Sequence, residues 1–147
     1  MIRRTAMNSA ERYERLAGRL GELHKRVRRM QEQWLREYDI SLLEYHIIIA
    51  VMRSDEISQS DIAAALDVDK ALISRQINTM VNKGLIIRDD DPNCRRKNKL
   101  SLSESTRNLI PSLMEAHRLA LERVFADVDE GRLDDLEAVL EGLVNKL

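Results

Sequence analysis

The stretch from Ser58 to Leu102 reads SQSDIAAALDVDKALISRQINTMVNKGLIIRDDDPNCRRKNKLSL, and this stretch decides the fold. Two short segments with apolar residues at helical spacing precede two short runs that are typical of strands. The helices are predicted at 59–66 and 70–83, with Gly84 as the stop signal of the second. The order helix, turn, helix, strand, basic loop, strand predicts a winged helix-turn-helix.

The second of these helices has a polar face opposite its apolar stripe. That face carries Lys70, Ala71, Ser74, Arg75 and Asn78. A DNA major groove admits one α-helix, whose short polar side chains then reach the base edges. We expect Arg75 to bond a guanine, Asn78 to read an adenine, and Lys70 and Ser74 to hold phosphate as well.

The predicted strands, 85–88 and 99–102, enclose a turn that is rich in cations. The basic residues in and beside this turn are Arg95, Arg96, Lys97 and Lys99. A basic loop beside the second helix can cross the DNA backbone and put an arginine into a narrow minor groove. The sequence therefore predicts double-stranded DNA as the partner, bound by a helix and a wing.

Long amphipathic helices are predicted on both sides of this stretch. The first, 8–36, has a heptad-like apolar stripe, and two more helices cover 103–127 and the residues from 129 onward. A central helix at 41–52 is apolar nearly all round, which is typical of a buried helix. The chain has too few core layers to cover all these stripes, so a homodimer is expected.

The fold class that follows is mostly α, a winged helix-turn-helix with a wing of two or three strands and a helical dimerisation region at both ends. Residues 1–40 and 108–147 are assigned to dimerisation, and 41–107 to the DNA-binding lobe. Although the net charge of the 147 residues is only −1, residues 70–107 carry nine Lys or Arg against four Asp or Glu. The basic side chains are thus concentrated where DNA binding is predicted.

Composition restricts the remaining classes of protein. A single cysteine, Cys94, excludes an internal disulfide framework, and no segment has the roughly 20 apolar residues of a membrane span. The charged N-terminus does not resemble a signal peptide, so a cytoplasmic location without membrane contact is expected. The sequence contains no Gly-rich phosphate loop and no nucleophile elbow, so neither an enzyme nor a cofactor is expected.

Four segments make the chain resemble the MarR (multiple antibiotic resistance regulator) family. They are Val68-Asp69-Lys70-Ala71-Leu72-Ile73-Ser74-Arg75, Asn82-Lys83-Gly84-Leu85-Ile86-Ile87-Arg88, Asp91-Pro92-Asn93-Cys94-Arg95-Arg96 and Leu100-Ser101-Leu102-Ser103-Glu104. The long helices before and after them also match, so the resemblance covers nearly the whole chain.

This resemblance implies a transcription regulator, most simply a ligand-responsive repressor, that binds a pseudo-palindromic operator as a homodimer joined through its first and last helices. It also implies that Arg96, which matches the arginine of the family's Asp-x-Arg signature, enters the minor groove. Two positions depart from the family pattern. Cys94 replaces the usual aspartate of that signature, which leaves Asp90 or Asp91 to brace Arg96, and Thr106 replaces a common glycine.

Family members commonly bind small aromatic ligands between the dimerisation and DNA-binding regions. The aromatic residues available for such an effector pocket are Tyr13, Trp34, Tyr38, Tyr45 and His46. The same side chains are equally consistent with a core at a helix junction.

Three alternatives stay open at the level of sequence. Cys94 lies beside cations that favour a thiolate, which would suit a redox switch. A zinc-sensing site would use His24, His46, His117, Glu44 and Glu115, but their spacing is not that of a zinc motif, so no metal is expected. A winged-helix adaptor that contacts proteins would need an apolar or acidic recognition face, which this chain lacks.

Overall fold

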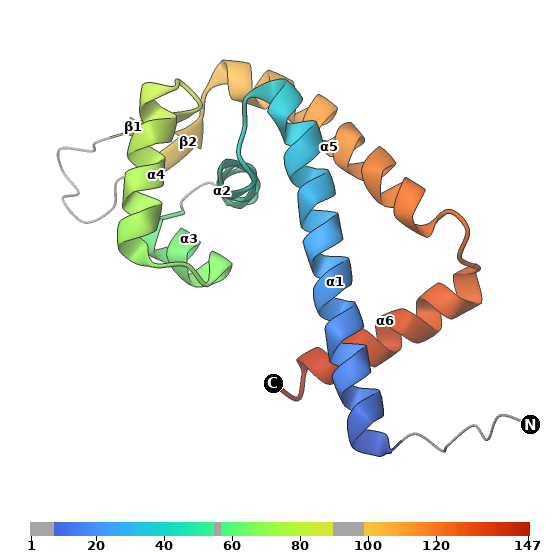
Figure 1. Ribbon diagram of the computed structural model, residues 1–147. Coiled ribbons are helices and arrows are strands. Elements are labelled where there is room, and N and C mark those ends of the chain that lie inside the picture. The colour runs from blue at the N-terminus through green and yellow to red at the C-terminus, as the bar shows by residue number, and fades with distance from the viewer. Residues whose placement is uncertain (1–7, 55–56, 90–98) are drawn as a thin grey trace, which may run out of the picture. The chain divides into compact units, whose positions relative to one another are not determined.

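The computed structural model describes residues 8–54, 57–89 and 99–147 and is mostly helical (Figure 1). In chain order the elements are α1 (Ser9–Leu35), the short 3-10 helix η1 (Arg36–Tyr38), α2 (Leu42–Met52), α3 (Gln59–Leu66), α4 (Lys70–Asn82), β1 (Ile86–Asp89), β2 (Lys99–Leu102), α5 (Glu104–Phe125) and α6 (Glu130–Val144). This order confirms the predicted winged helix-turn-helix between long terminal helices. The described wing has two antiparallel strands.

Contacts divide the chain into two units, residues 1–110 and residues 111–147. The first unit contains α1 to β2 and the first turns of α5, and the second contains the rest of α5 and α6. Pro111, which lies inside α5, is the first residue of the second unit. Whether these units serve DNA binding and dimerisation as assigned from the sequence stays a prediction.

Helix α2 lies at the centre of the first unit, where it packs against α1, α3 and β2. Its side chains Ile47 and Ile48 are fully buried. The apolar run predicted to form a central helix therefore does so. Around it the core is completed by fully or nearly fully buried residues from the neighbouring elements, namely Leu35, Ile40, Ile62, Ile73, Ile77, Met80, Ile86, Leu100 and Leu102.

Capping explains where several helices start. Ser41 with Glu44, and Ser58 with Asp61, form reciprocal capping boxes in which each side chain bonds the other residue's backbone amide. Asn8 caps α1, where its side chain accepts from the amide of Ala10.

The first wing strand begins at Ile86, one residue later than the predicted start at Leu85. The Leu85 amide donates instead to the carbonyl of Met80, and the Gly84 amide to that of Val81. With Gly84 at a φ of 72°, these bonds close α4 in a Schellman-type turn. Because its amide is used to end the helix, Leu85 cannot donate to the sheet. The register then pairs Ile86 with Leu102 and Asp89 with Lys99.

Helix α5 ends two residues earlier than predicted, at Phe125 rather than near Asp127. The Val128 amide turns back to the carbonyl of Phe125 and ends the helical ladder. At the other end Ser103 caps the helix, since its hydroxyl accepts from the Thr106 amide. Thr106 is buried, and its hydroxyl accepts a hydrogen bond from the Ser103 hydroxyl at the junction of β2 and α5.

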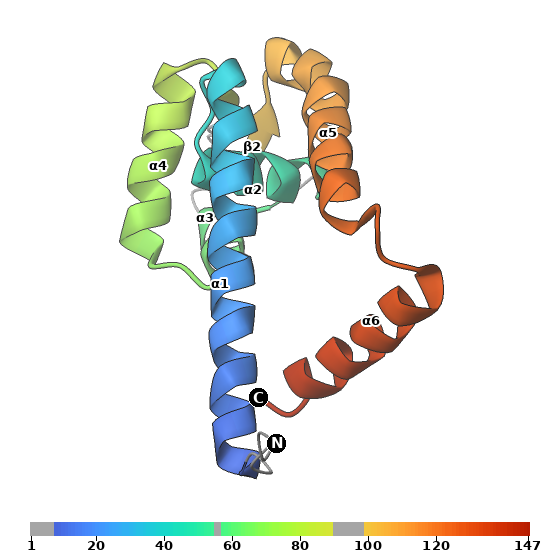
Figure 2. The same cartoon turned by 45° about the vertical axis from the view of Figure 1, so that its right-hand side comes forward.

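The predicted stripe of α1 is exposed over the N-terminal half of the helix, which extends beyond α2, α3 and α4 (Figure 2). Leu16, Leu20 and Leu23 are each 44–50% exposed. No helix among the described residues is long and apolar enough to cross a membrane.

Candidate nucleic-acid interface

The recognition helix α4 is held by a short turn and a strong cap. Asp67 ends α3 in the left-handed conformation, at a φ of 51°, and the Val68 amide bonds back to the carbonyl of Ala63. Asp69 then caps α4 by accepting from the amides of Ala71 at 2.9 Å and Leu72 at 3.1 Å. These bonds satisfy donors that a helix start otherwise leaves unpaired, so the turn sets the direction of α4.

Helix α4 separates its apolar and polar residues cleanly. Ile73, Ile77 and Met80 are fully buried and attach α4 to α3 and β1. Of the predicted DNA-contact residues on this helix, Lys70, Ala71, Arg75 and Asn78 are exposed and Ser74 is half-buried. The structure therefore brings the five predicted helix residues together on one outward face.

Two of these side chains differ in how they are held. Within the described ranges the Arg75 side chain has no hydrogen-bond or ion-pair partner, so its guanidinium remains available for a ligand. The Oδ1 atom of Asn78, in contrast, accepts a hydrogen bond of 2.7 Å from a guanidinium NH2 group of Arg88 on β1. The sequence predicted both residues for this face but contained no signal of the Asn78–Arg88 bond.

Most of the predicted wing contacts, namely Arg95, Arg96 and Lys97, lie outside the described residues, as do Cys94, Asp90 and Asp91. Lys99 is described; it is the first residue of β2 and is exposed. The DNA contacts of all four wing residues therefore stay predictions.

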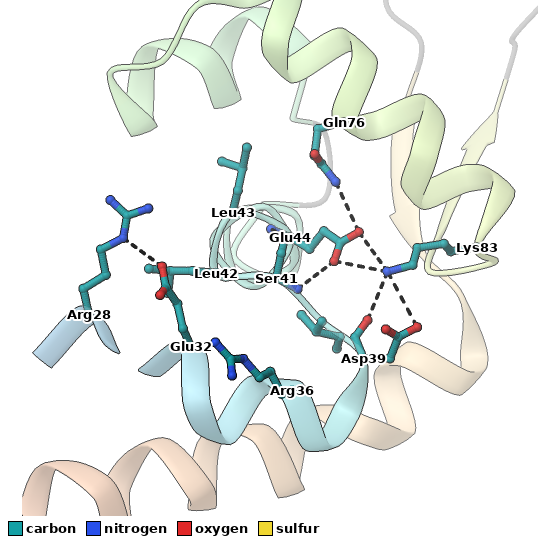
Figure 3. A pocket seen from close by; sticks show the side chains of 11 residues that line it. Arg28, Glu32, Arg36, Asp39, Ser41, Leu42, Leu43, Glu44, Gln76 and Lys83 are labelled. Carbon is teal, nitrogen blue, oxygen red and sulfur yellow. Dashed lines mark hydrogen bonds and ion pairs between the residues drawn. The ribbon is translucent and has the colours of Figure 1, made fainter. Parts of the chain in front are cut away.

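A buried carboxylate ties α4 to the start of α2 (Figure 3). Glu44 is only 3% exposed, and its oxygens accept from the Ser41 amide at 2.7 Å, the Gln76 amide group at 3.2 Å and the Lys83 ammonium at 3.2 Å. Lys83 also donates to the backbone carbonyl of Asp39 at 3.0 Å. This Glu44 network therefore links α4 to the segment that joins α1 to α2.

Only part of this network follows a local sequence pattern. Ser41 and Glu44 lie three residues apart, which is the spacing of a capping box. The partners Gln76 and Lys83 lie 32 and 39 residues further along the chain. No local pattern marks such pairs.

A cavity of about 620 Å³ opens beside the Glu44 network. Its lining comes from α1, η1, α2, α4 and the segment that joins α1 to α2. The lining residues are Arg28, Glu32, Arg36, Asp39, Ile40, Ser41, Leu42, Leu43, Glu44, Gln76 and Lys83 (Figure 3). Arg28 and Glu32, one turn apart on α1, form an ion pair of 2.9 Å in this lining. The cavity thus reaches the recognition helix directly, through Gln76 and Lys83.

Four of the five predicted pocket aromatics form a chain of ring contacts. Trp34 packs edge-on against Tyr45 with ring centroids 5.5 Å apart and against Tyr38 at 6.5 Å, and Tyr45 contacts His46 at 5.8 Å. Tyr45 is nearly fully buried, and burial raises the pKa of its phenol, an effect that the nearby charge of Arg53 partly offsets. Tyr45 therefore packs as a core residue.

Tyr13 does not belong to this aromatic group. It is 67% exposed and lies 21 residues before Trp34 on the same helix, which separates the two by roughly 30 Å along the axis at about 1.5 Å per residue. The aromatic residues also do not line the 620 Å³ cavity, so the predicted pocket and this cavity are different places.

The two glutamates weighed for a zinc site are bound by cations of the chain. Glu44 is bound by Lys83, and Glu115 forms an ion pair of 2.7 Å with Arg118, whose hydrogen bond lowers the pKa of that carboxyl. Among the described residues no three or more His, Cys, Asp or Glu side chains are grouped so that they could hold a metal ion.

Comparison with known proteins places this geometry in a family. Residues 38–97, which include α2, α3, α4 and β1, match the model of the MarR family. A relative from Thauera aromatica that is named as a transcriptional regulatory protein for the hcr operon is 31% identical over 105 residues. That match covers 70% of this chain and 60% of the relative, so the chain spans less than two thirds of its length.

Two further proteins match over more of their length. The uncharacterized HTH-type transcriptional regulator YhbI of Bacillus subtilis is 25% identical over 135 residues, which is 92% of this chain and 87% of the relative. The crystal structure of CouR from Rhodococcus jostii bound to p-coumaroyl-CoA superposes with a TM-score of 0.74 at 19% identity. That superposition covers 87% of this chain and 90% of CouR, and it shows a shared fold.

Proposed function

The chain belongs to the MarR family of transcriptional regulators, and on this premise we propose that it is a repressor that binds a pseudo-palindromic operator as a homodimer and responds to a small ligand. The observation that carries the DNA-binding part is the outward face of α4, where a capped helix presents Arg75 and Asn78 beside Lys70 and Ser74. A cationic and amide-bearing helix face is the chemistry that reads base edges in a major groove.

In this proposal the side chains of α4 divide the work of binding. Arg75 donates to the O6 and N7 atoms of a guanine, and Asn78 bonds an adenine. Lys70 and Ser74, near the helix start, bond phosphate and set the position of the helix on the duplex. On the wing, Arg96 enters the minor groove while Arg95, Lys97 and Lys99 neutralise the flanking backbone.

Exposed apolar side chains on the terminal helices support a homodimer. Leu136, Leu140 and Leu143 of α6 are 37–45% exposed, in addition to the exposed leucines of α1. Helix α1 carries seven Lys or Arg against four Glu, whereas α6 carries five acidic residues against one Arg. A second copy of the chain offers both the apolar surface and the opposite charge that these helices lack.

A two-fold dimer presents two copies of α4, so its operator consists of two half-sites in inverted orientation. For helix-turn-helix dimers these half-sites lie about one DNA turn apart, roughly 34–36 Å. Bound across a promoter, such a dimer blocks transcription, which is the basis for proposing repression.

The 620 Å³ cavity supports a ligand response, because a molecule bound there touches Gln76 of the recognition helix and Lys83 at its C-cap. CouR, which shares the fold, is bound to an aromatic acyl-CoA. The aromatic group around Trp34 and Tyr45 is the other place for an aromatic effector. In either place a ligand shifts DNA binding only by binding the operator-competent dimer more tightly or less tightly than the incompetent one.

The test is the binding of the purified protein to the DNA upstream of its own coding sequence, compared with an unrelated duplex of equal length. At about 150 mM salt the sequence-independent electrostatic contribution is reduced, so a preference reports base reading. We expect the upstream duplex to bind at least about tenfold more tightly. Equal, weak binding to both duplexes, and to pools of random sequence, would contradict the proposal and favour a protein-binding winged helix.

A further inference from the structure

One side-chain hydrogen bond joins the base-reading face of α4 to the wing. Arg88, on β1, donates from an NH2 group to the Oδ1 atom of Asn78 at 2.7 Å. A guanidinium has only donors, so the carbonyl of the Asn78 amide, not its NH2 group, must face Arg88. The orientation of the amide is thereby determined by chemistry.

The packing of β1 determines where the Arg88 side chain lies. Side chains alternate along a strand, so Arg88 projects to the same side as Ile86, which is buried, and Ile87 to the other side, where it is half exposed. The Nε atom of Arg88 is buried and has no hydrogen-bond partner among the described residues. Among the described residues, the bond to Asn78 is therefore the side-chain hydrogen bond that orients the guanidinium head.

This bond restricts what Asn78 can present to DNA. A free asparagine on an exposed helix face can rotate and offer either its carbonyl or its NH2 group to any acceptor or donor nearby. Held by Arg88, the amide keeps one lone pair of Oδ1 and both hydrogens of Nδ2 available. One acceptor beside one donor is the complement of the N6 and N7 atoms of adenine.

We propose that Arg88 is a positioning residue that holds the Asn78 amide for one base pair of each half-site, so that Asn78 and Arg88 together determine specificity at that position. The inference rests on the proposed DNA-binding function and deepens it. Arg88 itself does not contact the base. It acts through Asn78. Because Arg88 lies on β1, base discrimination then depends on how β1 packs against α4.

If Arg88 only attached the wing to α4, as a structural tether, its replacement would have a different outcome. Loosening a tether weakens binding to all sequences alike, because phosphate contacts carry no sequence information. Loosening a positioning contact lowers discrimination at the base pair that Asn78 faces and leaves the other positions as selective as before. The two roles are therefore separated by a profile over base pairs rather than by a single affinity.

The experiment uses the full chain. Sites are first selected from a pool of random duplexes, and affinities are then measured for the selected operator and for every single base-pair substitution in one half-site. The variants are Asn78→Ala, Arg88→Met and the double variant, with Arg53→Met as the matched control, because Arg53 is an exposed arginine at the end of α2. Methionine keeps the length of the arginine stem, and circular dichroism checks that each variant is folded.

We expect Asn78→Ala and Arg88→Met each to lose discrimination by about tenfold at the same base pair, with an adenine preferred there by the unaltered protein. The double variant should lose little more than either single one, because the two residues act as one unit. The Arg53→Met control should keep the full profile.

Two results would overturn the inference while leaving operator binding by the proposed repressor intact. One is a uniform loss of affinity in Arg88→Met across all duplexes, and the other is an unchanged profile in Asn78→Ala. If the unaltered protein enriches no sequence from the pool, the proposed function itself fails, and the inference fails with it.

Discussion

Arg75 is the exposed guanidinium on the outer face of α4 and has no partner within the described part of the chain. Since it supports neither the core nor a cap, its replacement tests binding without disturbing the fold. We expect Arg75→Glu to lower operator affinity by at least about 2 kcal/mol, because a bidentate base contact is lost and a carboxylate meets the phosphates.

The measurement for Arg75 is a titration of labelled operator at fixed salt, alongside a circular-dichroism melting curve. Arg53→Glu makes the same change in net charge at the end of α2 and should bind nearly normally. Normal binding by Arg75→Glu would show that the recognition face has been assigned wrongly.

Tyr45 provides a second test at the scale of single residues. Burial raises the pKa of its phenol above the ordinary value of about 10, so the folded chain keeps this proton when the unfolded chain has lost it. The contribution of Tyr45 to stability is therefore present below about pH 10 and falls as the pH rises beyond that value. An ultraviolet titration should show a late-ionising phenol that is missing in Tyr45→Phe, and an unchanged titration curve would contradict the burial.

The Glu44 network acts at the scale of elements, since it joins α2 and α4. Removing its cation leaves a carboxylate that is 3% exposed without its charged partner, and a buried group that loses its partner is costly. The Lys83 side chain is 34% exposed, so water offsets part of this cost. We expect Lys83→Met to lower the free energy of unfolding by about 1–3 kcal/mol.

Urea denaturation measures this change, and Lys146→Met, near the chain end, serves as the control. On a Glu44→Gln background the same Lys83→Met substitution should cost less, because the charge that it leaves unpaired is already gone. Equal costs on both backgrounds would mean that the ion pair contributes nothing to holding α4.

At the scale of the whole molecule, the exposed leucines of α1 and α6 are the surface that the proposed homodimer would bury. The double variant Leu136→Glu/Leu140→Glu puts two carboxylates into the apolar stripe of α6, which already carries five acidic residues. We expect it to be monomeric with unchanged helical content, and to lose operator binding because one copy of α4 reaches only one half-site.

Light scattering coupled to size-exclusion chromatography reads the mass directly, and Glu141→Gln on the same helix should remain a dimer. A double variant that stays dimeric would mean that another surface forms the interface. A monomeric unaltered protein would contradict the proposed dimer itself.

Most of the fold was predictable from the sequence because its signals are local. The capping residues Ser41, Ser58 and Asp69 mark helix starts, Gly84 marks the end of α4, and the spacing of apolar residues separates the buried stripe of α4 from its outer face. The errors were confined to element ends, as at Leu85, where the choice between helix closure and strand pairing depends on which carbonyl receives one amide.

The candidate site divides in the same way. Helical periodicity alone placed Arg75 and Asn78 on the outer face of α4, because residues on one helix face are determined by spacing. Only the tertiary structure decided that Asn78 is bound by Arg88, that Glu44 receives Lys83 and Gln76, and that Tyr45 is a core residue while Tyr13 is exposed. These pairs lie 10 to 39 residues apart along the chain or depend on burial, so no local pattern encodes them and they arise when the elements pack.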